Sequence, residues 1–344
     1  MNKNRVKTFQ NNKVSLADVA DAAGVSKMTA SRVLRDEGGF SEKTRAKVMA
    51  EVERLGYLPN RLATVFAGDV RSTFVGVSIP ELGNEIFAQV LEGIDRKLSS
   101  FQHQTVLGMT QNEPEQEERW LETVLSWQPA ALIVTGRAHT PKAMQLLRSA
   151  GIPVVELWDF NSSPLDMCVG LNHFDSGYSM GQFLGVQGYT SFGYVGTHHD
   201  TANAASARLA GYTKSVDNAR GTLKKQLLLK DAPGFYTGYY GTEQLLAANR
   251  NVEVIYYQND NMAIGGLSYC QKRGMRIPQD IGIAGWGDLP IASIQPYRLT
   301  STTVPLLKIG QLAAEMVLGR INDQPTQDVR DVGFRLIQGT TVHV

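Results

Sequence analysis

The polar side chains between positions 26 and 32 are of the types that contact DNA bases and phosphates. Residues 26–29 read Ser-Lys-Met-Thr, and Arg32 follows within the next helical turn. Lys27 can donate to guanine O6 and N7, and Met28 can contact a thymine methyl group or lie over base edges. Ser31 offers a further hydroxyl for phosphate or base contacts. On the first turns of one helix, these side chains would form a surface that reads base sequence.

The surrounding residues carry the signals of three short helices. Ser15 and Asp18 have the spacing of a capping box, and Gly24 supplies the left-handed residue that ends a first helix. Ser26 is placed to cap a second helix, and a third is predicted between positions 41 and 56. Two short helices joined by a tight glycine-containing turn are typical of a helix-turn-helix, whose second helix enters the major groove. A small helical bundle with a solvated basic face is the alternative that this pattern alone leaves open.

The positive charge is concentrated at the N-terminal end. Residues 1–68 hold 12 Lys and Arg against 7 Asp and Glu, a net charge of +5, whereas the rest of the chain carries −4. A localised basic segment is expected where only one module meets a polyanion. The 344 residues are enough for two or three domains, and a hydrophobic content of 42% can form real cores.

The sequence favours a cytoplasmic protein without a metal or other cofactor. Cys168 and Cys270 are too few for a disulfide framework, and no Cys/His cluster has zinc-ligand spacing. Residues 1–13 are polar and basic, so we recognise no export signal. No run approaches the roughly 18 apolar residues of a membrane span. We therefore expect no membrane partner.

Residues 15–68 resemble the DNA-binding head of the LacI family. The family pattern reads L-x-D-V-A-x-x-A-G-V-S-x-x-T-x-S-R-V-L, then S-x-x-T-R-x-x-V, then L-G-Y-x-P-N-x-x-A. The matching residues are Leu16, Asp18, Val19, Ala20, Ala23, Gly24, Val25, Ser26, Thr29, Ser31, Arg32, Val33, Leu34, Ser41, Thr44, Arg45, Val48, Leu55, Gly56, Tyr57, Pro59, Asn60 and Ala63. The resemblance implies a helix-turn-helix domain over residues 1–58, followed by a hinge helix and linker over residues 59–70.

In this family the hinge helix orders when two copies meet on operator DNA, and a leucine from each copy wedges into the minor groove. Phe66 stands at the leucine position, and we expect its apolar ring to keep the wedge role. Packing of Phe66 on the core domain is the alternative. Arg61 is expected to follow the backbone or the minor groove. The DNA-contacting residues that pattern and resemblance imply are Ser15, Leu16, Ser26, Lys27, Met28, Thr29, Ser31, Arg32, Tyr57, Asn60, Arg61, Ala63 and Phe66.

From Phe74 onward, short apolar runs alternate with helix-length amphipathic stretches, which is typical of parallel sheets with helices on both faces. The predicted strands are Phe74–Ile79, Thr105–Met109, Ala131–Thr135, Val154–Leu157, Phe192–Val195, Gln226–Leu229, Val254–Tyr257 and Ile281–Ala284. The predicted helices lie near 84–99, 114–126, 141–149, 175–187, 203–218, 239–249 and 260–273. Two groups of strands favour two lobes, and ligands of open α/β sheets bind beyond the carboxyl ends of the strands. A cleft between the lobes is therefore the expected ligand site.

This region resembles the effector domain of the LacI family, which is similar to periplasmic sugar-binding proteins. The whole chain would then be an α/β protein with an N-terminal helix-turn-helix head and hinge helix, followed by a two-lobed periplasmic-binding-protein-like core of parallel sheets flanked by helices. Residues 71–344 would bind the effector and dimerise, with lobe one at about 71–170 and 302–324 and lobe two at about 171–301 and 325–344. The chain would pass between the lobes near Leu171, Ser301 and Pro325. We expect a homodimer because no heptads follow Val329, with a tetramer as the alternative.

Four positions of the expected cleft match family motifs. Arg208 stands in the motif R-x-x-G-[YW], whose arginine faces the effector, and Tyr236 matches an aromatic residue that stacks on the ligand. Asn259 matches the ligand-facing asparagine of N-D-x-x-A, and Asp260 is expected to cap the next helix. Where the family has G-[FY]-D-[DN], this chain reads Gly-Trp-Gly-Asp, ending at Asp288. Asp288 either replaces the usual aspartate or the pocket lacks that carboxylate.

The residues favour an anionic effector. Arg208 offers a fixed fork for a carboxylate, and the missing aspartate removes an acidic neighbour. The runs E-I-F-A-Q-V-L-E-G-I, L-S-W, A-H-T-P and G-I-P-V-V-E-L-W-D resemble the gluconate-repressor branch of the family, which implies gluconate, a related aldonate or its phosphate. Trp158 and Tyr236 as core aromatics, and His139 as a surface histidine, are the alternatives. The further residues expected around the cleft are Pro80, Asn84, Phe87, Arg137, His139, Glu156, Trp158 and Asp159.

The sequence favours a DNA-binding regulator over other classes of protein. The glycines at 282, 285 and 287 have the wrong spacing for a dinucleotide fingerprint, and His198-His199-Asp200 has no further metal-ligand cluster beside it. A sugar-acid enzyme or a solute-binding protein would leave the DNA-reading head unexplained, and an architectural DNA binder would leave the cleft unexplained. We predict a repressor of sugar-acid catabolism genes whose operator binding depends on a small molecule, with a neutral sugar or nucleobase as the alternative effector.

Overall fold

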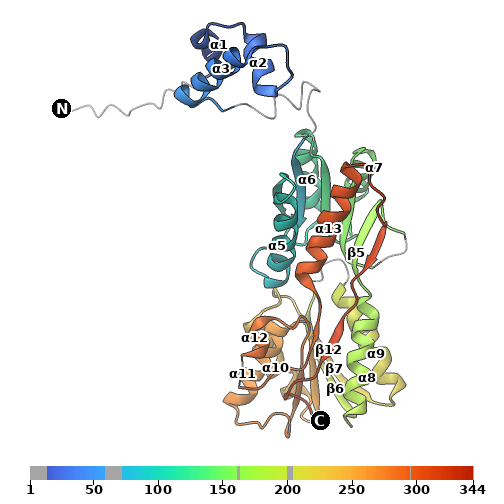
Figure 1. The fold of residues 1–344 in the computed structure, drawn as a ribbon. Coiled ribbons are helices and arrows are strands. Elements are labelled where there is room, and N and C mark those ends of the chain that lie inside the picture. The colour runs from blue at the N-terminus through green and yellow to red at the C-terminus, as the bar shows by residue number, and fades with distance from the viewer. Residues whose placement is uncertain (1–13, 59–71, 161–162, 200–203, 295, 344) are drawn as a thin grey trace, which may run out of the picture. The chain divides into compact units, whose positions relative to one another are not determined.

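The computed structural model describes residues 14–58, 72–160, 163–199, 204–294 and 296–343 (Figure 1). The chain divides into two compact units, Met1–Arg71 and Ser72–Val344. The predicted hinge helix, with Asn60, Arg61, Ala63 and Phe66, lies outside the described residues. Within the described ranges, no helix is both long enough and apolar enough to cross a membrane.

The first unit contains the three predicted helices, α1 (Leu16–Ala23), α2 (Lys27–Arg35) and α3 (Glu42–Leu55). Each begins at a serine, Ser15, Ser26 or Ser41, whose hydroxyl accepts a backbone N–H of the first turn. The helices pack around a small apolar core, whose buried residues are Val19, Ala20, Ala23, Ala30, Val33 and Val48. The predicted helix-turn-helix head is confirmed.

Lobe one of the second unit is a six-stranded parallel sheet in the order β11-β5-β4-β3-β1-β2. Its strands are β1 (Phe74–Ile79), β2 (Gln104–Met109), β3 (Ala131–Thr135), β4 (Val154–Asp159), β5 (Met167–Leu171) and β11 (Val329–Asp331). Alternate residues of β3 face opposite sides of this sheet. Ile133 packs in the cluster of α5 (Glu85–Ser99) and α13 (Leu306–Ile321). Leu132 packs against α6 (Pro114–Ser126) and α7 (Pro141–Ser149), so both faces of the sheet are covered.

Lobe two is a four-stranded parallel sheet in the order β7-β6-β8-β9, with β6 (Ser191–Thr197), β7 (Thr222–Leu229), β8 (Val254–Tyr257) and β9 (Gly282–Ala284). One face packs against α8 (His173–Val186) and α9 (Ala204–Asn218), which lie side by side in Figure 1. The other face packs against α10 (Phe235–Ala248) and α11 (Asp260–Lys272). Helices α8 and α9 approach closely at Gly177, where a Cβ atom would lie only 1.8 Å from the Arg208 carbonyl oxygen. This contact brings the start of α8 beside Arg208.

The chain passes between the lobes three times. It leaves β5 at Leu171 and enters α8 at His173, and it returns after β10 (Ser301–Thr303), which pairs antiparallel with β12 (Arg335–Ile337). The third passage lies between β11 and β12, because β11 pairs with β5 in the sheet of lobe one. The predicted third passage near Pro325 is therefore wrong, because the chain stays in lobe one until after Asp331.

The two-lobed α/β core confirms the predicted fold class. Each of the eight predicted strands has a counterpart, although several begin earlier than expected. The sequence patterns missed β5, β10, β11 and β12, together with α12 (Pro290–Ser293) and α13. Helix α10 begins at Phe235 instead of near 239, and α8 begins at His173 instead of 175. The earlier start of α8 matters because His173 lines the pocket between the lobes.

Candidate functional site

The first turns of α2 present the residues predicted to read DNA. The Ser26 hydroxyl accepts the backbone N–H of Thr29 at 3.0 Å and lies 2.9 Å from the Thr29 hydroxyl, so the start of the helix is fixed. Lys27 and Met28 remain outside, and Met28 is 73% exposed. An apolar side chain that the head does not bury is suited to contact thymine methyl groups.

Ser31 and Arg32, in the next turn of α2, contact residues at the end of the helix and in the loop after it. Arg35 Nη2 donates to the Ser31 hydroxyl at 3.0 Å. The Arg32 guanidinium lies over Gly39, where a Cβ atom would be 2.7 Å from Nη2. Gly39 also has a φ of 76°, which glycine adopts more easily than other residues. Arg32 thus stays exposed at the edge of the predicted reading surface, where an arginine can reach phosphate.

Three residues predicted to contact DNA also stabilise the fold of the head. Ser15 and Asp18 form the capping box, and the Ser15 N–H donates to Asp18 Oδ2 at 2.8 Å. Leu16 and Tyr57 pack against the head core, and burial raises the pKa of Tyr57. Contacts from Ser15, Leu16 and Tyr57 to DNA stay predictions.

A pocket lies between the two lobes, at the carboxyl ends of strands from both sheets. It encloses about 530 Å³ of empty space, part of which is open to solvent. Its lobe-one lining consists of Glu81, Asn84, Ile86, Phe87, Asn112 and Trp158. Its lobe-two lining consists of His173, His199, Ala204, Ala205, Arg208, Pro233, Gln258, Asn259 and Trp286. The predicted effector residues brought together here are Asn84, Phe87, Trp158, Arg208 and Asn259.

Arg208 on α9 is a buried cation in this pocket, only 6% exposed. Its Nη1 donates to His173 Nδ1 at 3.1 Å, and its Nη2 donates to the Gln258 carbonyl oxygen at 3.3 Å. The guanidinium carbon lies 4.0 Å from the centre of the Trp286 ring. Among the described residues, no carboxylate forms an ion pair with Arg208. A buried charge without an opposite charge is costly, and a bound anion would offset that cost.

His173, the first residue of α8, is held as a neutral ring. Burial and the nearby charge of Arg208 lower the pKa of His173 to about 3. A neutral imidazole has one donor and one acceptor nitrogen. Because Nδ1 faces an Arg208 N–H, the proton is on Nε2, which donates to the Trp158 carbonyl oxygen at 3.1 Å. The sequence analysis did not predict His173 as a pocket residue. Its position just after the expected passage between the lobes at Leu171 could have indicated that it lies at the cleft.

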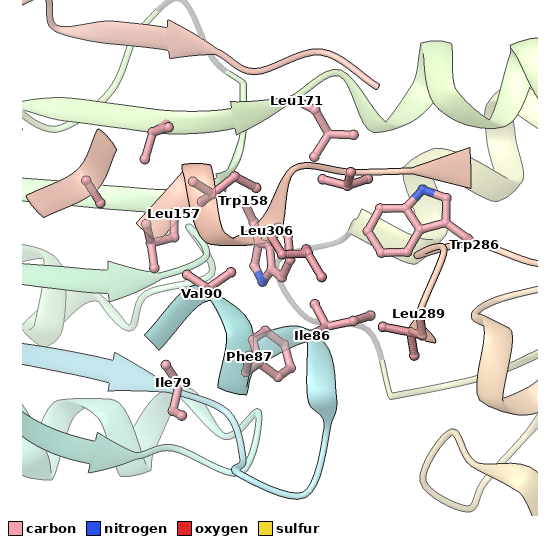
Figure 2. Packing of buried hydrophobic residues seen from close by; sticks show 14 of the residues in the cluster. Ile79, Ile86, Phe87, Val90, Leu157, Trp158, Leu171, Trp286, Leu289 and Leu306 are labelled. Carbon is pink, nitrogen blue, oxygen red and sulfur yellow. The ribbon is translucent and has the colours of Figure 1, made fainter. Parts of the chain in front are cut away.

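Trp158, the last residue but one of β4, has a left-handed conformation, with a φ of 84° that is rare for a bulky residue. Strict strand alternation would turn Trp158 away from the side of Val155 and Leu157, but all three belong to one core cluster. The Trp158 ring centre lies 5.6 Å from that of Phe87 and 6.4 Å from that of Trp286 (Figure 2). These three rings form an apolar wall that spans both lobes.

Four helices, α5, α8, α9 and α11, begin at the pocket. Asn84 and Asn259 cap α5 and α11 with their side-chain oxygens, so each amide NH₂ remains able to donate to a ligand. The prediction that Asp260 caps α11 is wrong, because its buried carboxylate instead accepts from the loop after β9 and from β10. Helix N-termini carry partial positive charge, and together they favour an anion in the pocket.

Four predicted effector residues form a separate cluster in lobe one: Arg137, His139, Glu156 and Asp159. His139 Nδ1 donates to a Glu117 carboxylate oxygen at 2.5 Å, and its Nε2 lies 3.7 Å from Glu156 Oε1. Burial lowers the pKa of His139, but the hydrogen bond to Glu117 and the nearby negative charge of Glu156 outweigh burial and raise it to about 9. Arg137 lies 3.4 Å from Glu156 and 3.7 Å from Asp159. Their placement in the pocket was wrong because Glu156 faces the α6 side of the sheet.

Three further predicted residues also lie outside the pocket lining: Pro80, Tyr236 and Asp288. Tyr236 on α10 is 81% exposed, so it is neither in the pocket nor in the core. The backbone N–H of Asp288 donates to the Ser301 hydroxyl at 3.2 Å, and neither Gly287 nor Asp288 is among the described residues that line the pocket. Pro80 is buried at the end of β1, where its carbonyl oxygen accepts the Gln111 N–H.

The sequence analysis did not predict Gln258 and Trp286 as lining residues, although both lie in or next to segments that match family motifs. Gln258 precedes Asn259, and its side chain accepts the Thr197 N–H at 2.7 Å and donates to the His199 carbonyl oxygen at 3.0 Å. Trp286 belongs to the Gly-Trp-Gly-Asp segment, and its indole N–H donates to the Ser176 hydroxyl at 3.1 Å. Across the described ranges, no group of three or more His, Cys, Asp or Glu side chains could hold a metal ion.

Comparison with known proteins places both units in one family. Residues 15–60 match the profile of bacterial regulatory proteins of the lacI family, and residues 182–342 match that of a periplasmic binding protein-like domain. The HTH-type transcriptional regulator GntR of Escherichia coli (strain K12) is 33% identical over 328 residues, which span 95% of this chain and 98% of the relative. The regulator IdnR of the same strain is 29% identical, spanning 97% of this chain and 100% of the relative.

Solved structures show the same architecture. A LacI-family transcriptional regulator from Silicibacter pomeroyi is 35% identical, with a TM-score of 0.90 over 96% of this chain and 100% of that one. The lac repressor dimer bound to operator and the anti-inducer ONPF has a TM-score of 0.82 at 24% identity, over 96% of this chain and 99% of that one, and supports the fold alone. The relatives are transcriptional regulators and not enzymes. From head to core, the chain belongs to the LacI family of bacterial transcriptional regulators, which bind operator DNA and small-molecule effectors.

Proposed function

We propose that this regulator represses sugar-acid catabolism genes and that an aldonate such as gluconate, bound between the lobes, controls its operator binding. The observation that carries the proposal is the buried Arg208 guanidinium, which has no carboxylate partner among the described residues. A carboxylate-bearing ligand would supply the missing charge and accept from the arginine fork.

The rest of the pocket supports a small anion with many hydroxyl groups. The N-termini of four helices add partial positive charge, and Asn84 and Asn259 each keep an amide NH₂ for a ligand oxygen. Of the lining residues that the structure describes, Glu81 is the one carboxylate, and it can accept from ligand hydroxyl groups. The apolar rings of Phe87 and Trp158 suit the carbon skeleton of such a ligand. The resemblance of several sequence runs to the gluconate-repressor branch points to the same class.

The regulator is expected to act as a homodimer whose two heads read the two halves of a near-palindromic operator. Base contacts from Lys27, Met28 and Thr29 would give specificity, while Arg32 would add salt-sensitive affinity. The effector must bind one arrangement of the lobes better than the other, and the usual coupling between such sites is about 1–3 kcal/mol. The two lobes are joined by three chain connections, and both contribute residues to the pocket. A ligand bound in the pocket therefore contacts both lobes and can change the angle between them.

Calorimetry with the full chain tests this proposal. We expect gluconate or a close aldonate to bind, and glucose and hypoxanthine to give no heat. A fluorescence assay with operator DNA, selected from a random duplex pool, should then show a changed affinity when the bound aldonate is present. Binding of a neutral sugar or nucleobase, with no aldonate binding, would overturn the effector assignment. Size-exclusion chromatography with light scattering measures the oligomeric state, and a monomer on operator DNA would contradict the dimer.

A further inference from the structure

His173 links the two lobes through its ring, in addition to the backbone connection at that point. It is 3% exposed and follows directly on the passage from β5 to α8. Its Nε2 donates to the carbonyl oxygen of Trp158 on β4, and its Nδ1 accepts from Nη1 of Arg208 on α9, each at 3.1 Å. One imidazole therefore connects the cation of lobe two to a strand end of lobe one.

Arg208 has further neighbours besides His173, among them the Tyr256 hydroxyl. The Gln258 carbonyl oxygen accepts from Nη2 at 3.3 Å, and the Trp286 ring covers one face at 4.0 Å. The ring covers only one face and the Gln258 bond is long, whereas the bond from Nη1 to His173 is the shorter of the two hydrogen bonds and orients the guanidinium. The donors that remain then point in a set direction, which is what a carboxylate requires for two parallel hydrogen bonds.

We propose that His173 is a positioning residue for the carboxylate of the effector, which holds the Arg208 fork in its binding direction and ties it to lobe one. The proposal rests on the anionic effector of the proposed function and adds the residue that orients its binding group. His173 needs no contact with the ligand for this role. The neutral Nε2–H form is essential, because a ring protonated at Nδ1 would face an Arg208 N–H with another donor.

The same bond gives the ligand a connection to lobe one. The Trp158 carbonyl group that accepts from His173 belongs to a residue in a strained left-handed conformation, with a φ of 84°. Gly170 of the neighbouring strand β5 faces this carbonyl group, and a Cβ atom there would lie 2.2 Å from its oxygen. A shift of Arg208 on binding an anion would therefore act through His173 on the end of β4, where the indole of Trp158 meets Phe87.

The experiment compares His173→Leu with His173→Gln in the full chain. Leucine keeps most of the volume but neither hydrogen bond, whereas glutamine can both donate and accept. We expect His173→Leu to weaken gluconate binding by about tenfold or more, since the charge-assisted bonds from a mispositioned guanidinium are largely lost. His173→Gln should stay within about threefold of the wild type. Binding of glucitol, the neutral polyol of the same skeleton, should change little in either variant.

Two controls separate positioning from a merely structural role. Met180→Ala, in the buried face of the same helix, should lower the unfolding temperature without changing the ratio of gluconate to glucitol affinity. In nitrogen-15 NMR spectra of the wild type, the His173 ring should keep the Nε2–H form without titrating between pH 5 and pH 8. Gluconate binding that His173→Leu leaves unchanged, or a His173 ring that titrates near its ordinary pKa, overturns the positioning role alone. A wild type that binds glucitol but no anion overturns both this role and the proposed effector.

Discussion

Replacing Arg208 with methionine should abolish the response to an aldonate while leaving the ligand-free protein folded. Methionine keeps a long apolar side chain against Trp286 and removes the guanidinium, together with its bonds to His173 and Gln258. Two charge-assisted hydrogen bonds from a guanidinium to a ligand carboxylate contribute about 1.5–3 kcal/mol each. Loss of both predicts a decrease in gluconate affinity of about 10²–10⁴-fold.

The stability of the ligand-free protein should change little, because two effects oppose each other. Arg208→Met gives up two hydrogen bonds to neutral groups, but it also removes a buried charge that has no carboxylate partner among the described residues. Replacing such a charge with an apolar side chain of similar size is often close to neutral. We therefore expect the unfolding temperature to stay within about 4 °C of the wild type, which corresponds to roughly 1–2 kcal/mol in a domain of this size.

Three measurements test the Arg208 prediction: gluconate affinity by calorimetry, the unfolding temperature without ligand, and operator affinity with and without gluconate. Operator affinity without ligand should match the wild type, because Arg208 belongs to a different unit from the head. Arg208→Lys is the matched control, since it keeps the charge without the fork and should bind gluconate with intermediate affinity. Gluconate binding that survives in Arg208→Met would refute the carboxylate assignment. A large loss of stability without ligand would instead show that Arg208 has a structural role.

Three further predictions concern the head, the charge of the pocket and the dependence of stability on pH. Lys27→Ala should change which operators are selected from a random pool, at a cost of about 1–3 kcal/mol for the preferred base; an equal loss for every duplex would show a phosphate contact instead. Glu81→Gln should raise the affinity for a dianion such as glucarate about tenfold relative to gluconate, because a like charge is removed from the pocket lining, and competition calorimetry measures the ratio. Burial lowers the pKa of His139, but the hydrogen bond to Glu117 and the nearby charge of Glu156 raise it to about 9. Their contribution to stability, up to about 3 kcal/mol, is complete below pH 6.5 and is lost as the pH rises through 9. Chemical unfolding from pH 6 to pH 10 should show this loss in the wild type, and a His139→Gln variant with the same pH profile would contradict it.

The head could be predicted in detail from the sequence because its signals are local. Ser15, Ser26 and Ser41 cap their own helices, and Gly24 and Gly56 end two of them in left-handed conformations. Each signal acts over three or four residues, so it can be recognised without knowledge of the rest of the fold. The contacts of the head with DNA cannot be predicted in this way, because they depend on a partner molecule and not on neighbouring residues of the chain.

Four of the six elements that were missed, β10, β11, β12 and α13, lack such local signals. Strands β10, β11 and β12 have three residues each, too few to show a period, and they exist because distant segments pair with them. Helix α13 starts after Pro305 without a side-chain cap, so its beginning carries no capping signature. The third passage between the lobes was misplaced for the same reason, since only the pairing of β11 with β5 shows where the chain turns back.

The geometry at the end of β4 explains why Trp158 lines the predicted pocket and Glu156 does not. Polar residues at the end of β4 were expected in the cleft because ligands bind beyond the carboxyl ends of strands. A regular strand would place Glu156 and Trp158 on the same side of the sheet. The φ of 84° at Trp158 breaks this alternation, so the indole turns to the pocket while Glu156 stays with His139 and Glu117 on the α6 side.

No sequence pattern predicts a tryptophan in the left-handed conformation, because the residue types that favour this conformation are glycine and, less often, asparagine or aspartate. The consequence for function is large. Ordinary strand alternation places Glu156 on the α6 side, opposite Val155 and Leu157. Asp159 follows the break and lies beside Arg137, so both carboxylates lie outside the pocket lining. Had they lined the pocket, they would have compensated the Arg208 cation and favoured a neutral ligand. Regular alternation at Glu156 and the strained conformation at Trp158 together account for the failed placement of these residues and for the shortage of carboxylates in the described pocket lining, on which the aldonate proposal depends.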